Sequence, residues 1–101
     1  MAHFIVTFRI ESNSSYQSRY ESFMKKAYEL AGGSPKTWEE TTSFLSFQAT
    51  GSADSIRDSL YLGSEFNAIW DMMVVIDLDA RKKATKGDVK YLSTLTSNLG
   101  F

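Results

Sequence analysis

Two periodicities alternate along this chain, and their order constrains the fold more than any other feature. Residues 3–11 alternate strictly between two faces, and one face is apolar: Phe4, Val6, Phe8, Ile10. Such a run of β-branched and aromatic residues predicts a strand. Residues 16–31 instead repeat their apolar side chains at helical spacing and stop at Gly32 and Gly33, which suit a left-handed helix exit. The chain therefore starts with a strand and then a helix.

The remaining segments continue this alternation. Residues 36–50 hold two strand segments or one bent strand, clearest at Ser43–Thr50 and less clear around Trp38. A second helix begins after the N-cap candidate Ser52 and ends near Gly63, and the strongest strand is Trp70–Leu78. The order strand, helix, strand, strand, helix, strand predicts an α+β, ferredoxin-like βαββαβ sandwich: a four-stranded antiparallel sheet with two helices on one face.

The domain organisation is simple. The 101 residues form one expected domain, with its core in residues 3–78 and a basic loop and tail in residues 79–101. The apolar positions of the tail suit either a short helix or an added edge strand, and the pattern leaves both open: Val89, Leu92, Leu95, Leu99.

Composition narrows the function classes. The chain has no cysteine, which rules out disulfides, thiol nucleophiles and cysteine metal sites. A net charge of −1 argues against a nucleic-acid binder that uses its whole surface. No apolar run is long enough for a membrane helix, and the start lacks the features of a signal peptide, so we expect a cytoplasmic protein with no membrane partner.

The sheet face without helices is the first candidate surface. If the even residues of Trp70–Leu78 face the helices, the open face carries a largely apolar set: Ile5, Thr7, Arg9, Phe44, Met73, Val75. On this face Arg9 lies near Asp71, and His3 lies near Asp77. Exposed apolar surface usually marks an interface, so we expect a homodimer that uses this face. The alternative is that the C-terminal segment folds back over the face, and an exchanged tail would combine both ideas.

Acidic residues are the only candidates for metal chemistry. Asp77 and Asp79 share one face at the end of the last strand, and their carboxylates suit Mg²⁺ or Mn²⁺. Solvation of a strand end by acidic residues is the simpler explanation of that spacing. His3 is the single histidine, and at position three it is poorly placed for a Ser-His-Asp mechanism.

A cluster of positive charge near the C-terminus is the third candidate site. It comprises five cations opposed by Asp88 alone: Arg81, Lys82, Lys83, Lys86, Lys90. Such a cluster can contact phosphates, which need positive charge but carry no sequence information. A solvated loop is the simpler explanation of the cluster, and the chain has no RNP1 motif.

Several stretches together resemble a known family, the small Cas2-like proteins and the SinR-like group beside them. The resemblance is carried by residues 3–10, Trp38-Glu-Glu-Thr-Thr-Ser-Phe-Leu-Ser-Phe, Ser52-Ala-Asp-Ser-Ile-Arg-Asp-Ser-Leu and Asp71-Met-Met-Val-Val-Ile-Asp-Leu. It implies a ferredoxin-like fold and a homodimer. Some Cas2 proteins use an aspartate near the end of the first strand for metal-dependent nuclease activity, and that position corresponds to Arg9. A guanidinium cannot ligate Mg²⁺, although Glu11 lies two residues further on the same face.

The sequence thus predicts a non-catalytic, dimeric binding or assembly module that needs no cofactor. One alternative is a Mg²⁺- or Mn²⁺-dependent nuclease with Glu11, Asp77 and Asp79 as ligands. The other is a weak nucleic-acid binder that uses residues 81–90.

Overall fold

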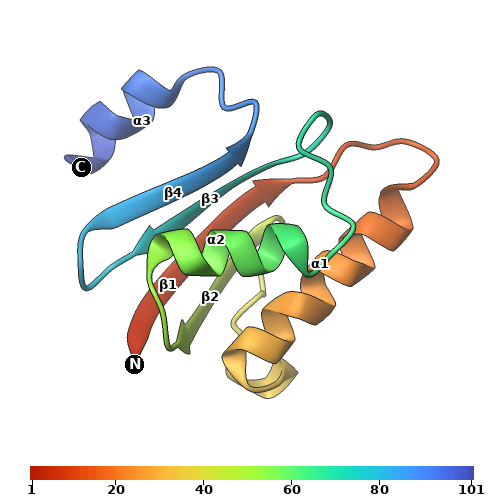
Figure 1. Ribbon diagram of the computed structural model, residues 1–101, viewed down its shortest axis with the longest axis horizontal. Coiled ribbons are helices and arrows are strands. Elements are labelled where there is room, and N and C mark those ends of the chain that lie inside the picture. Colours follow the sequence, from red (N-terminus) through yellow and green to blue (C-terminus); the bar gives the residue numbers. More distant parts are fainter.

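The computed structural model describes all residues from 1 to 101 and contains four strands and three helices (Figure 1). The elements are β1 (Ala2–Arg9), α1 (Tyr16–Ala31), a 3₁₀ turn η1 (Ser34–Lys36), β2 (Phe44–Ala49), α2 (Ala53–Leu62), β3 (Met72–Asp77), β4 (Lys82–Gly87) and α3 (Leu92–Leu99). The strands form one antiparallel sheet in the order β2-β1-β3-β4, and α1 and α2 cover one of its faces (Figure 1). The predicted α+β, ferredoxin-like arrangement is confirmed, with an additional C-terminal helix. No helix is long and apolar enough to cross a membrane.

The two long helices begin and end where the sequence places them. Ser52 and Ser55 form a reciprocal capping box at the start of α2, which satisfies two of its free backbone N–H groups. α1 ends at Gly32, whose φ of 87° lies in the left-handed region that glycine adopts without strain. Local signals in the sequence therefore mark where α2 begins and where α1 ends.

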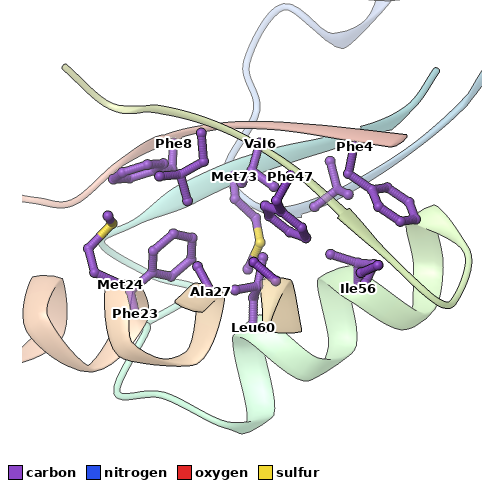
Figure 2. Packing of buried hydrophobic residues seen from close by; sticks show 14 of the residues in the cluster. Phe4, Val6, Phe8, Phe23, Met24, Ala27, Phe47, Ile56, Leu60 and Met73 are labelled. Atoms are coloured by element: carbon purple, nitrogen blue, oxygen red, sulfur yellow. The ribbon is translucent and has the colours of Figure 1, made fainter. Parts of the chain in front are cut away.

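A single aromatic and aliphatic core fills the space between the sheet and these helices (Figure 2). The even residues of β1 project into it, and the rings of Phe8 and Phe23 lie 4.8 Å apart, in the range of favourable aromatic pairs. Fully burying a side chain of this size stabilises the fold by about 2–3 kcal/mol before entropy is counted. The core is thus what holds α1 and α2 against β1.

The expected strand around Trp38 is reduced to one bridge. Trp38 exchanges two backbone hydrogen bonds with Ser46, at 2.9 and 3.0 Å, but neither neighbour extends the pairing. Pro35 in η1 precedes it, and a proline disfavours regular pairing because it has no N–H. A short segment therefore covers the middle of the outer edge of β2.

The expected basic loop is instead mostly a strand, so the prediction for this segment is wrong. β4 pairs with β3 from Asp77↔Lys82 to Met72↔Gly87 and extends the sheet by one strand. The Asp77 side chain accepts the backbone N–H groups of Asp79 and Ala80, both at 3.0 Å, and so closes the connecting turn.

The far end of β4 shows an unusually close backbone contact. Gly87 has a φ of 91°, and a Cβ atom there would lie 2.0 Å from the carbonyl oxygen of Asp71. Only glycine fits this position, because both the dihedral angle and the space exclude a side chain. After Gly87 the chain forms α3, so of the two structures expected for the tail, a short helix or an edge strand, the helix is observed.

Candidate functional site

The strand register decides which residues reach the open face of the sheet. Val6 pairs with Val75 and Phe8 pairs with Met73, and directly opposed residues share a face. Met73 and Val75 therefore point toward the helices and are fully buried, as Figure 2 shows for Met73. Their predicted place on the open face is wrong, and Met72, Val74 and Ile76 lie on that face instead.

The other predicted members of this face lie where the pattern placed them. Ile5 and Phe44 are half-buried, and Thr7 and Arg9 are exposed. Thr7 pairs with Phe44 and with Val74, which sets these side chains on one surface. Arg9 is exposed opposite Met72, whereas the Asp71 side chain is buried against Arg19, so the expected contact between Arg9 and Asp71 is not made.

The sequence analysis missed a second aromatic residue on this surface. The bridge to Ser46 puts Trp38 on the open side, where its ring meets that of Phe44 edge to face at 5.8 Å. Trp38 remains 43% exposed, so this aromatic pair is available to a partner. We call Ile5, Thr7, Arg9, Trp38 and Phe44 the uncovered face.

The β3–β4 side of the same sheet surface is closed by the chain itself. Lys83 lies opposite Ile76, and its ammonium group donates a hydrogen bond to the carbonyl oxygen of Phe101. The Arg81 guanidinium lies 5.1 Å from the centre of the Phe101 ring. Val74 and Ile76 are buried although they lie outside the main core. The C-terminal segment therefore folds back onto its own subunit, and it covers only part of the open face.

The three candidate metal ligands do not come together. Asp77 is buried in the turn after β3, while Glu11 follows the opposite end of the antiparallel neighbour β1. Phe4, the partner of Asp77, is seven residues from Glu11, or about 20 Å along an extended strand. No group of three acidic or histidine side chains in the structure is placed to hold a metal ion.

Asp79 is engaged with His3. Its carboxylate accepts the backbone N–H of His3 at 2.7 Å and lies 2.9 Å from Nδ1 of the ring. These two hydrogen bonds, the side-chain one first, lower the pKa of Asp79 from its ordinary value. His3 thus contacts Asp79 and not Asp77, which was the expected neighbour. Both side chains are about half exposed, which is typical of a surface pair that closes a strand end.

A buried ion pair at the other end of β3 was also missed. The Arg19 guanidinium donates to the carboxylate of Asp71, and both side chains are almost completely buried. Arg19 also donates to the carbonyl of Glu11 at 2.9 Å and to the hydroxyl of Ser15 at 3.0 Å. The free positions of the Asp71 carboxylate accept the backbone N–H groups of Glu11 and Asn67, both at 2.9 Å. With its polar atoms paired, this cluster joins the loops before α1 and before β3 and has no free group for catalysis.

The predicted phosphate-contacting cations are distributed around β4. Lys82 and Lys86 lie on the helix side of the sheet, and Lys83 lies on the open side. The Lys86 ammonium sits 4.4 Å from the centre of the Tyr61 ring. Arg81 and Lys90 flank the strand and are exposed. The five cations therefore follow one edge of the sheet and do not form a single patch.

Comparison with known proteins adds no assignment. No family model, curated protein or solved structure matches this chain.

Proposed function

We propose that this chain is a non-catalytic binding module that pairs with a second copy of itself through the uncovered face. The observation that carries the proposal is the exposed Trp38–Phe44 pair beside Ile5 and Thr7, on a sheet surface that the chain covers only in part. Aromatic side chains of this kind supply most of the binding energy at protein interfaces.

The arrangement of charge fits such a contact. No strand position on the open face carries a carboxylate, and Arg9 stands at the end of β1. A two-fold axis near Thr7 sets each aromatic pair against the partner sheet and leaves Arg9 at the rim, where water solvates it. The polar groups at the centre are the small side chains of Thr7 and Ser46, whose desolvation costs little when they find partners.

The acidic residues support a role without catalysis. Asp71 holds a buried arginine, Asp77 closes a turn, and Asp79 binds His3. Each carboxylate that the sequence offered for metal chemistry near β3 already has a structural partner.

Solution mass tests the proposal. Thr7→Glu places like charges across the two-fold contact, so we expect multi-angle light scattering to give two 11.4-kDa chains for the wild type and one for the variant. Ser18→Glu, an equal charge on the exposed side of α1, is the matched control and should stay dimeric. A monomeric wild type at the highest soluble concentration, or a dimer that tolerates Thr7→Glu, refutes this interface.

A further inference from the structure

The outer edge of β4 presents backbone groups that no part of the chain uses. The Leu78 N–H donates to the carbonyl of His3 at 2.9 Å, which fixes the phase of hydrogen bonding between β1 and β3. Even residues of β3 therefore bond β1, and odd residues bond β4. In the antiparallel register, Ala84 and Lys86 then face β3, so the N–H and C=O groups of Lys83 and Thr85 point away from the sheet.

Neighbouring elements leave this row of groups free. The hydrogen bonds outside the regular elements include none from the backbone of Lys83 or Thr85. α3 lies beside β4 (Figure 1), and the hydrogen bond that joins β4 to the residue after the C-cap of α3 runs from the Lys83 side chain to Phe101. The opposite edge of the sheet differs, because the segment at Trp38 occupies Ser46 there.

Five cations lie on β4 or beside its ends. The ion pairs of the structure involve none of the five cations between Arg81 and Lys90. Arg81 contacts the Phe101 ring, Lys86 contacts the Tyr61 ring, and Lys83 donates to the main-chain oxygen of Phe101. Residues 81–90 therefore carry five positive charges against one negative charge, at Asp88, although the whole chain carries a net charge of −1.

We propose that the edge of β4 binds an acidic, extended peptide segment, which adds to the sheet as a fifth strand. A row of alternating N–H and C=O groups is matched by another polypeptide backbone, and it is not matched by a phosphate chain. Alternate side chains of the added strand reach the two faces of the sheet, where they meet Lys83 on one side and Lys82 and Lys86 on the other. Aspartate and glutamate are the residues that these positions favour. The site is separate from the uncovered face and does not depend on dimer formation.

Fluorescence anisotropy with a labelled peptide of alternating glutamate and valine tests this proposal. The Thr85 N–H points away from β3, so Thr85→Pro removes one outward donor and no hydrogen bond to β3. Proline is tolerated at such edge positions. We expect about a fivefold loss of affinity for Thr85→Pro and no loss for Thr85→Ala, since one backbone hydrogen bond contributes about 1 kcal/mol. A peptide with lysine in place of glutamate should not bind.

Amide hydrogen exchange keeps the test decisive if Thr85→Pro fails to fold. In the free wild-type protein the amides of Lys83 and Thr85 should exchange faster than those of Ala84 and Lys86, and the acidic peptide should slow them. Equal binding of both peptides, absence of saturable binding, or unchanged exchange at Lys83 and Thr85 overturns the proposal. Competition by oligothymidine with no effect of Thr85→Pro also overturns it and identifies a general polyanion site.

Discussion

The two faces of the sheet differ in how their burial is achieved. On one face, α1 and α2 enclose Val6, Val75 and Phe8 in a continuous core. On the other, the C-terminal segment closes the β3–β4 side and leaves the β1–β2 side open around Thr7. β3 belongs to both faces, and nearly all of its residues are buried. Burial alone therefore does not assign a residue of β3 to the core, and only the register does.

Adjacent valines of β3 provide the strongest test of this difference. Val75→Asp places a charge in the closed core, so we expect the loss of more than about 4 kcal/mol and no cooperative unfolding transition. Val74 lies on the other face, where displacement of the C-terminal segment lets water reach a charge. Val74→Asp should therefore lower the free energy of unfolding by about half as much as Val75→Asp. Urea denaturation followed by circular dichroism compares them. Equal losses would show that both faces are closed to the same degree.

The ion pair at the end of β3 gives the next largest expected effect. Asp71→Ala leaves the Arg19 guanidinium buried without its partner, which typically costs about 3–5 kcal/mol. The double variant Arg19→Met/Asp71→Leu should lose clearly less than Asp71→Ala, because no buried charge remains. Free energies of unfolding for Arg19→Met, Asp71→Leu and the double variant measure the coupling. Additive losses would mean that the two side chains act independently.

The exposed pair at the opposite end of the sheet gives the smallest effect. The pKa of Asp79 is lowered, so its contribution to stability is present above its unfolded pKa and is lost as pH falls through the folded value. Carboxyl carbon titration by NMR should place the pKa of Asp79 below 3.8, the ordinary value. His3→Ala should raise it only part of the way, because the backbone N–H remains. A pKa that His3→Ala leaves unchanged would contradict the role of the imidazole.

The elements β1, α1, β2, α2 and β3 were predictable because they follow local signals, but the two faces of β3 could not be assigned from the sequence. Met72 to Ile76 are all apolar, so a period of two fits either assignment, and the flanking Trp70 and Leu78 favoured the wrong one. The pairing of Val6 with Val75 is a long-range fact that no pattern within β3 contains.

The sequence analysis also missed the strand β4 and the ion pair between Arg19 and Asp71, and both misses have physical causes. Three lysines in β4 have low strand propensity, yet charged side chains are common on edge strands such as β4. Arg19 gave a usable signal, since it is the one cation on the apolar stripe of α1 and a buried cation requires an acid. Which acidic residue pairs with Arg19 could not be predicted, because the tertiary fold brings Asp71 to it.

Gly87 shows that tolerance to substitution does not always follow side-chain burial. This half-exposed residue has no side chain to bury, but its backbone rests on that of Asp71. This contact joins the C-terminal end of β4 to Asp71 of the buried ion pair. A methyl group added at Gly87 therefore disturbs both the end of β4 and the ion pair. In a mutational scan, such a position belongs with the core, although its accessibility places it at the surface.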